Sequence, residues 1–249
     1  MHDMEIEARH TAAAAAGGRD KRAVVRAMFE RIAPRYDLLN HLLSFGLDRW
    51  WRRRALRALD WTRVPDGDYL DLCAGTLDVA AQLARQRGFR GFVVGADFAA
   101  PMLAAGAGKA PAGSVSPEAA DAQQLPLRDG SMAGAIVAFG IRNVASLEAA
   151  LSEAHRVLAR GAPLVILEFT TPRRWLVRAA YHLYFHRVVP IVGGAISGHP
   201  PAYRYLPESV AHFPPERELA ARMRAAGFAD VRWTSLTFGV VAVHSGRRA

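Results

Sequence analysis

The chain has 249 residues, of which 51% are hydrophobic and 22% charged, and this balance excludes a mostly disordered chain. The single cysteine, Cys73, excludes a disulfide scaffold and indicates a reducing compartment. The 32 basic and 23 acidic residues give a net charge of +9, which favours an anionic partner such as nucleic acid, an anionic membrane surface or an acidic ligand.

Helical patterns come first along the chain. Residues 1–20 mix acids, bases and five consecutive alanines, so we expect a flexible tail there rather than a signal peptide. Apolar residues at helical spacing predict a helix over residues 21–33, and an arginine-rich helix follows over residues 48–59. We therefore expect residues 21–60 to form a helical cap of a single domain that covers residues 21–249.

Strands and helices then alternate along the middle of the chain. Four of the strands are clear apolar runs, and the third is weaker because it contains Pro117. This alternation predicts an α/β fold, with a doubly wound, mostly parallel sheet covered by helices on both faces. The expected strands are residues 69–73, 92–96, 115–120, 134–139 and 164–169, and the expected helices are residues 79–87, 101–109 and 147–158.

The end of the chain has a different pattern. A helix over residues 216–226 precedes two apolar runs, residues 231–236 and 240–244, which a tight turn joins. Two strands so close together predict an antiparallel hairpin, which brings the sheet to seven strands. A C-terminal antiparallel hairpin on an otherwise parallel sheet is typical of one large class of proteins that bind nucleotide-like cofactors.

Small or acidic residues follow the first three strands, at the edge where open parallel sheets bind ligands. A turn of small residues after the first strand lets backbone amides approach a ligand. An aspartate at the end of the second strand can accept hydrogen bonds from both hydroxyls of a ribose, and an Asp-Ala pair after the third strand can meet an adenine. These candidate cofactor-binding residues are Asp71, Gly75, Thr76, Asp97, Asp121 and Ala122. The first turn lacks the Gly-x-Gly-x-x-Gly pattern of dinucleotide sites, which favours a cofactor with one ribose and no pyrophosphate, such as S-adenosylmethionine.

Five longer motifs occur in order along the chain. They are Phe29-x-x-Ile32-Ala33-x-x-Tyr36-Asp37-x-x-Asn40-x-x-x-Ser44-Phe45-Gly46, Phe139-Gly140-x-Arg142-Asn143-Val144, Leu167-Glu168-Phe169-x-x-Pro172, Tyr203-x-Tyr205-Leu206-x-x-Ser209 and Gly239-Val240-Val241-Ala242-x-His244. With these motifs the chain resembles the S-adenosylmethionine-dependent C-methyltransferases of menaquinone and ubiquinone biosynthesis, and the likeness covers residues 24–247.

The resemblance implies a class I methyltransferase with a Rossmann-like fold, in which Thr76, Asp97, Asp121 and Ala122 contact the cofactor. Methyl transfer to a ring carbon needs an electron-rich ring, and a quinol becomes one when a hydroxyl ionises. We expect Arg142 and Asn143, which follow the fourth strand, to bind that oxygen. We expect Tyr36 to reach over the cofactor. The alternatives are a structural ion pair for Arg142 and aromatic packing for Tyr36. The histidines have no metal-ligand spacing, so we expect no metal.

The resemblance leaves the acceptor open. We expect methylation of demethylmenaquinol to menaquinol, and the alternatives are the polyprenyl-benzoquinol of ubiquinone biosynthesis or another lipophilic acceptor. The first turn reads Gly75-Thr76-Leu77-Asp78, where the family usually has glycine at the third position. This position favours a positive φ and a bare backbone beside the ligand. Leu77 therefore keeps a further alternative open, namely a catalytically silent paralogue that acts as a scaffold.

Two basic and aromatic segments point to a membrane. Residues 175–189 are apolar and aromatic, are flanked by arginines, and belong to an expected substrate-side insertion over residues 173–212. They would line a groove for a prenyl tail or rest among lipid headgroups, and the alternative is a helix buried on the sheet. Residues 49–54 fit a membrane surface as well as nucleic acid, and no named RNA-binding motif occurs. We therefore expect a cytoplasmic protein, peripheral at the inner face of an anionic membrane, with no nucleic-acid partner; a homodimer stays open.

Overall fold

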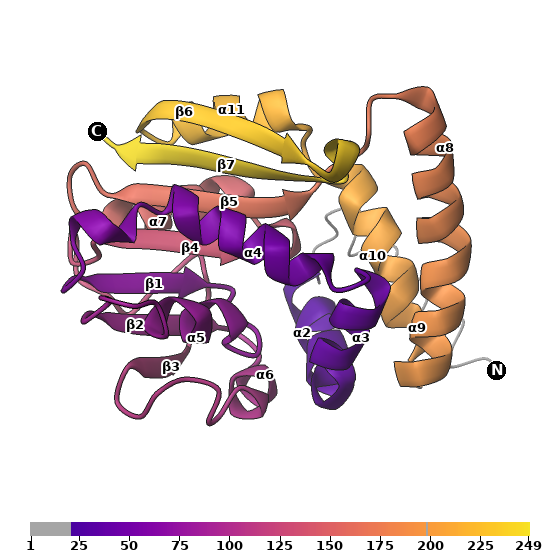
Figure 1. Ribbon diagram of the computed structural model, residues 1–249, viewed down its shortest axis with the longest axis horizontal. Coiled ribbons are helices and arrows are strands. Elements are labelled where there is room, and N and C mark those ends of the chain that lie inside the picture. The colour runs from indigo at the N-terminus through magenta and orange to yellow at the C-terminus, as the bar shows by residue number, and fades with distance from the viewer. Residues whose placement is uncertain (1–20, 198) are drawn as a thin grey trace.

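The computed structural model describes residues 21–197 and 199–249 (Figure 1). The expected flexible tail, residues 1–20, lies outside the described residues. Within the described residues, seven strands form one sheet in the order β3-β2-β1-β4-β5-β7-β6. The strands are β1 (Asp68–Leu72), β2 (Phe92–Asp97), β3 (Val115–Ala119), β4 (Gly134–Ala138), β5 (Pro163–Phe169), β6 (Phe228–Leu236) and β7 (Val241–Arg248).

The predicted sheet topology is confirmed. Strands β1 to β5 are parallel, and β7 pairs antiparallel with both β5 and β6. Pro117, which weakened the sequence signal for β3, lies in an edge strand that pairs only with β2, so its missing N–H disrupts the sheet little. The strand order reverses between β1 and β4, and this switch point is where open α/β sheets bind ligands.

Helices cover both faces of the sheet because side chains alternate along each strand. Leu70 and Leu72 pack with the apolar residues of α7 and α11 on one face. Tyr69 packs with α4 and α5 on the other, where α4 crosses in front of the sheet in Figure 1. The helices are α4 (Leu47–Ala58), α5 (Asp78–Ala84), α6 (Ala100–Ala105), α7 (Leu147–Val157) and α11 (Glu216–Ala225).

The remaining helices gather beyond the carboxyl ends of β1 to β5, on the right of Figure 1. Val25 and Leu39, from the N-terminal segment, pack in one apolar cluster with Val189 and Tyr205 from the second half of the chain. These cap helices are α2 (Lys21–Ile32), α3 (Tyr36–Leu43), α8 (Trp175–Leu183), α9 (Val189–Ser197) and α10 (Pro200–His212), with a π-helical turn over Tyr184–Val188.

Helix α4 packs on the sheet, whereas α2 and α3, the other helices of the expected N-terminal cap, pack beyond its strand ends. Its apolar stripe, which includes Trp51, Ala55 and Leu56, buries against the sheet, and the helix therefore belongs to the core. No helix in the described part of the chain is long and apolar enough to cross a membrane.

Candidate active site

Three neighbouring cavities lie at the carboxyl end of the sheet. Two of them are small, with volumes of about 20 and 30 Å³; they share wall residues, and we call them together the strand-end cleft. The third has a volume of about 330 Å³, is open to solvent, and lies among the cap helices, so we call it the cap cavity. The two parts of the cleft share Cys73, Asp97, Phe98, Gly140 and Asn143, and the cleft and the cap cavity share Phe29, Tyr36 and Phe139. The cleft at the strand ends and the cap cavity are therefore neighbours that share one wall.

Asp97 faces both parts of the cleft from the end of β2. Its Oδ2 accepts a hydrogen bond from the amide of Gly75 (2.8 Å), and its Oδ1 accepts one from the amide of Ala99 (2.9 Å). Burial raises the pKa of Asp97, whereas the two amide donors lower it. Each oxygen keeps a further lone pair, so the carboxylate is held in place and still able to accept from a diol.

Asp121 and Ala122 line the outer part of the cleft, where sequence reasoning expected an adenine. The carboxylate of Asp121 accepts a hydrogen bond from the amide of Gln123 (2.9 Å) and pairs with Arg22 of α2 (3.1 Å). Asp121 and Ala122 are therefore brought together with Asp97 in one cleft, as their places after neighbouring strands predicted.

Fewer side chains of the turn after β1 line the cleft than the sequence suggested. Gly75 lines the cleft with a φ of +53°, but neither Asp71 nor Thr76 belongs to the wall of the three cavities. Asp71 Oδ2 instead accepts a hydrogen bond from the amide of Ala80 (2.9 Å) in α5. Burial raises the pKa of Asp71 to about 7. The hydroxyl of Thr76 donates to Asp37 Oδ1 (2.5 Å). The side chains of Asp71 and Thr76 therefore stabilise the turn through these hydrogen bonds and do not line the cleft.

Leu77 has the positive φ that sequence reasoning expected, +61°. Its side chain is only 5% exposed and is absent from the walls of the cleft. A Cβ placed on Gly95 or Gly106 would collide with Leu77, so the leucine fills the space between these two glycines. The side chain therefore packs into the core beneath the turn and leaves the cleft open.

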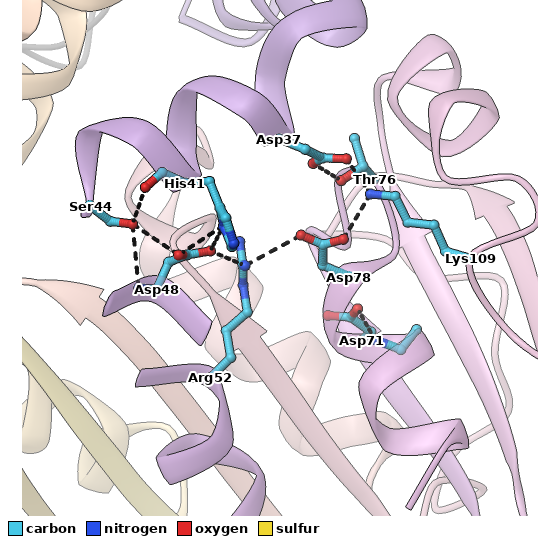
Figure 2. A network of polar contacts seen from close by, with 10 residues as sticks. Asp37, His41, Ser44, Asp48, Arg52, Asp71, Thr76, Asp78 and Lys109 are labelled. Carbon is cyan, nitrogen blue, oxygen red and sulfur yellow. Dashed lines mark hydrogen bonds and ion pairs between the residues drawn. The ribbon is translucent and has the colours of Figure 1, made fainter. Parts of the chain in front are cut away.

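A polar network joins the cap to the cleft (Figure 2). Lys109, which follows α6, contacts Asp37 of α3 and pairs with Asp78 at the start of α5 (2.7 Å). Arg52 of α4 pairs with Asp48 (2.5 Å) and with Asp78 (3.3 Å). Sequence reasoning missed this network because Asp37 and Asp78 lie 72 and 31 residues from Lys109. It holds α3 and α4 against the turn that carries Gly75.

Arg142 lies in the wall of the cap cavity and also forms an ion pair. Its Nη1 donates to Glu168 Oε1 (2.7 Å) and to the carbonyl of Phe139 (2.5 Å). Its guanidinium lies 5.5 Å from the ring centroid of Phe169. Sequence analysis offered a structural ion pair as the alternative to binding of the quinol oxygen; the ion pair is present, and the same side chain also lines the cavity.

Tyr36 and Asn143 occupy different positions from Arg142. Tyr36 lines both the cleft and the cap cavity and packs edge-on against Phe29, with ring centroids 5.9 Å apart. Asn143 lines only the cleft, where its Oδ1 accepts a hydrogen bond from Tyr205 (3.0 Å). Arg142 and Asn143 diverge because successive side chains of the 3-10 turn Ile141–Asn143 point about a third of a turn apart.

The described residues contain no group of three or more His, Cys, Asp and Glu side chains that could hold a metal ion. Around the cleft, Cys73 and Phe139 have positive φ values of +55° and +62°. Such conformations are costly for side-chain-bearing residues and concentrate at functional sites. Both residues lie at the carboxyl ends of their strands, β1 and β4, where they line the cleft.

This sheet and cleft define the class I methyltransferase fold. Similar solved structures include an S-adenosylmethionine-dependent methyltransferase from Thermotoga maritima, with a TM-score of 0.61 and 21% identity over 90% of this chain and 100% of that chain. The [4+2]-cyclase SpnF is similar too, with a TM-score of 0.65 and 15% identity over 91% of this chain and 96% of that chain. At such identities the likeness shows the fold alone.

The ubiE/COQ5 methyltransferase family matches residues 17–248, and the chain belongs to this family. It is 52% identical over 223 residues to a demethylmenaquinone methyltransferase of Thermus thermophilus, covering 89% of this chain and all of the relative. It is 44% identical over 228 residues to a ubiquinone/menaquinone biosynthesis C-methyltransferase of Geobacter sulfurreducens, covering 90% of this chain and 88% of the relative. The resemblance drawn from the motifs is therefore confirmed, and the protein is a methyltransferase.

Proposed function

We propose that this protein transfers a methyl group from S-adenosylmethionine to a ring carbon of demethylmenaquinol. The observation that carries the proposal is that the strand-end cleft, which holds the carboxylate of Asp97, shares the wall residues Tyr36 and Phe139 with a larger apolar cavity. The names of the relatives support a quinol acceptor, because they include demethylmenaquinone methyltransferases. A cavity with mostly apolar walls suits a prenylated ring better than a small polar acceptor.

The residues of the cleft fit S-adenosylmethionine. Asp97 has lone pairs free for the ribose hydroxyls, and Asp121 and Ala122 lie where the adenine would bind. Gly75 has a φ of +53°, which glycine adopts without strain, and its lack of a side chain lets the backbone approach the ligand. When bound, S-adenosylmethionine supplies an electrophilic methyl group on a sulfonium.

Arg142 is the residue that we expect to stabilise the reacting quinol. Negative charge develops on the ring oxygen as the quinol ionises, and the guanidinium in the cavity wall offers charge and hydrogen-bond donors to it. Asp97, Asp121 and Ala122 would hold S-adenosylmethionine so that its methyl group faces the ring carbon, which the ionised oxygen makes nucleophilic. Once a prenylated acceptor fills the cavity, the surrounding apolar side chains would keep water away from the ring.

Tyr36 and Asn143 lie where the strand-end cleft meets the cap cavity. Tyr36 lines both cavities, so we propose that its ring orients the acceptor over the cleft. We first expected Asn143 to bind the quinol oxygen together with Arg142. Its place in the wall of the cleft favours contact with the cofactor instead.

We also propose that the mouth of the cap cavity rests on an anionic membrane, on the cytoplasmic side. Six large apolar side chains, each 63–78% exposed, belong to segments around this cavity, and Phe45 among them lines it. They are Phe45, Trp175, Leu176, Leu183, Ile191 and Phe238. Exposed Arg173, Arg174 and Arg178 lie beside them and suit anionic headgroups. In sedimentation with vesicles, the fraction of protein bound to anionic lipid should fall as the salt concentration rises. An equal bound fraction with neutral vesicles would contradict the proposed membrane contact.

The experiment that tests the activity uses purified protein and S-adenosylmethionine with a deuterated methyl group. We expect demethylmenaquinol to gain one labelled methyl on a ring carbon, faster than a polyprenyl benzoquinol does. Faster labelling of the benzoquinol would favour the ubiquinone alternative. Cofactor binding without labelling of either quinol would contradict the proposal and favour the silent scaffold.

A further inference from the structure

Two buried polar groups stand out in the wall of the cap cavity. The hydroxyl of Tyr181 and the Nε of Arg142 make no hydrogen bond with any residue in the described part of the chain. Two other tyrosines of the wall are bonded: Tyr184 donates to the carbonyl of Leu43 (2.8 Å), and Tyr205 donates to Asn143 (3.0 Å). A buried hydroxyl without a partner costs free energy, so its retention indicates a partner in the bound state.

Aromatic contacts place Tyr181 on the same side of the cavity as Arg142. The Tyr181 ring stacks on Phe185, with centroids 4.2 Å apart and planes inclined by 25°. Phe185 contacts Phe169 edge-on at 5.6 Å, and the guanidinium of Arg142 lies 5.5 Å from the Phe169 ring. Tyr181 itself is 8% exposed. The phenol is therefore held rigidly in a wall that also presents a cation.

A quinol brings two ring oxygens into such a cavity. The ionised oxygen is best placed against the cation of Arg142, which leaves the other oxygen in need of a neutral donor. Burial raises the pKa of Tyr181, so its phenol stays protonated and able to donate.

We propose that Tyr181 binds the substrate by donating a hydrogen bond from its hydroxyl to the ring oxygen that Arg142 does not hold. This inference rests on the proposed quinol acceptor. With this hydrogen bond, α8 would contact the quinol ring as well as the prenyl tail. It also makes the enzyme specific for a ring with two oxygens.

The first test compares Tyr181→Phe with Tyr69→Phe. Tyr181→Phe keeps the ring stack, so we expect the KM for demethylmenaquinol to rise roughly three- to tenfold, with kcat and the Kd for S-adenosylmethionine nearly unchanged. Its Tm should not fall, because the hydroxyl has no partner in the described part of the chain. In Tyr69→Phe the lost hydroxyl bonds the carbonyls of Trp61 (3.2 Å) and Val64 (3.1 Å), so the Tm should fall while KM stays constant. A lower Tm and an unchanged KM in Tyr181→Phe would overturn the proposal.

The second test removes the oxygen from the substrate instead. Binding of demethylmenaquinol and of an analogue that lacks one ring hydroxyl is measured by titration for wild type and for Tyr181→Phe. Wild type should prefer the quinol, and the variant should lose most of that preference. An equal preference in both proteins would overturn the proposal. If wild type binds the quinol with this discrimination but does not methylate it, the proposed activity fails and the binding role of Tyr181 stands.

Discussion

The strand-end cleft and the cap cavity are built in different ways. The cleft is formed by residues at the ends of neighbouring strands, and backbone amides hold its central carboxylate, Asp97. The cap cavity is formed by helices from both halves of the chain, and its walls are mostly apolar and aromatic side chains. The sheet itself therefore builds the cleft that we propose for the cofactor, whereas packing between distant helices builds the cavity that we propose for the acceptor.

This difference predicts separate effects of mutation. Changes in the cleft should act on cofactor affinity, because its residues are positioned by the backbone. Changes in the cap cavity should act on the rate or on the KM and choice of the acceptor, because we propose that its residues meet the ring. The polar network around Lys109 links the two regions and should transmit the effect of a change in one to the other.

Arg142→Ala should give the largest effect. Loss of a preorganised donor to a developing oxyanion costs about 2.7–4 kcal/mol, so we expect kcat to fall roughly a hundredfold or more. The change also leaves Glu168 buried and unpaired, which should lower the free energy of unfolding by about 3–5 kcal/mol. Single-turnover methylation, normalised to folded protein, measures the first effect separately from the second.

Arg142→Lys serves as the matched variant. Lysine keeps a charge for Glu168 but lacks the planar guanidinium, so stability should recover more fully than the rate. A near-normal rate per folded molecule in Arg142→Ala would show that the arginine is only an ion-pair partner. The catalytic assignment would then move to Tyr36.

Asp97→Ala should weaken binding of S-adenosylmethionine tenfold or more. Each hydrogen bond to a charged acceptor is worth about 1.5–3 kcal/mol, and Asp97 is positioned to accept from two ribose hydroxyls. Calorimetric titration measures the effect. Asp66→Ala is the control, since Asp66 pairs with Arg90 at the surface (2.6 Å) and should leave the Kd unchanged. An equal Kd for folded Asp97→Ala and wild type would remove Asp97 from the cofactor site.

Leu77→Gly should separate stability from cofactor binding. Glycine relieves about 1 kcal/mol of strain at the positive φ, but the loss of a buried leucine costs about 2–5 kcal/mol. The net result should be a fall of about 1–4 kcal/mol in the free energy of unfolding, with the cofactor Kd within about twofold of wild type. Tighter binding at unchanged stability would mean that the leucine obstructs the cleft.

Asp71→Asn should change how stability depends on pH. Burial raises the pKa of Asp71 to about 7 from an ordinary value of 3.8, so the folded state binds the proton more tightly than the unfolded state. The contribution of this group to stability is complete below about pH 4 and is lost as the pH rises to about 7. Asparagine retains an acceptor for the amide of Ala80, so the variant should be more stable than wild type at pH 8.

Chemical denaturation of both proteins from pH 4 to pH 8 measures this difference. The two stability curves should converge toward pH 4 and separate toward pH 8. Parallel curves would mean that Asp71 is ionised throughout this range in the folded protein.

The sequence predicted the cleft better than the cap cavity, for physical reasons. Asp97 and Asp121 follow strands of a parallel sheet, so strand register alone brings them together. Asp71 and Thr76 lie within a turn, where the amide of Ala80 and the carboxylate of Asp37 determine the side-chain directions. Those partners belong to later or distant segments, so the turn sequence does not reveal them.

The cap cavity depends on contacts that local patterns do not encode. Its walls join α2 and α3 to α8 and α10 across most of the chain, and the apolar segment that contains Tyr181 includes a π-helical turn. The sequence indicated that this segment meets lipid or substrate but not which side chains face inward. The sequence pattern likewise did not predict the 3-10 turn Ile141–Asn143, which directs Arg142 and Asn143 to different walls.

The structure of a complex with S-adenosylhomocysteine and demethylmenaquinol tests the central claim most directly, since it shows whether the two regions meet as donor and acceptor sites. We expect the ribose on Asp97, the sulfur beside Gly75, and the quinol ring in the cap cavity next to Tyr36 with an oxygen toward Arg142. A quinol ring bound outside the cap cavity, or a sulfur turned away from Tyr36, would contradict the proposed function.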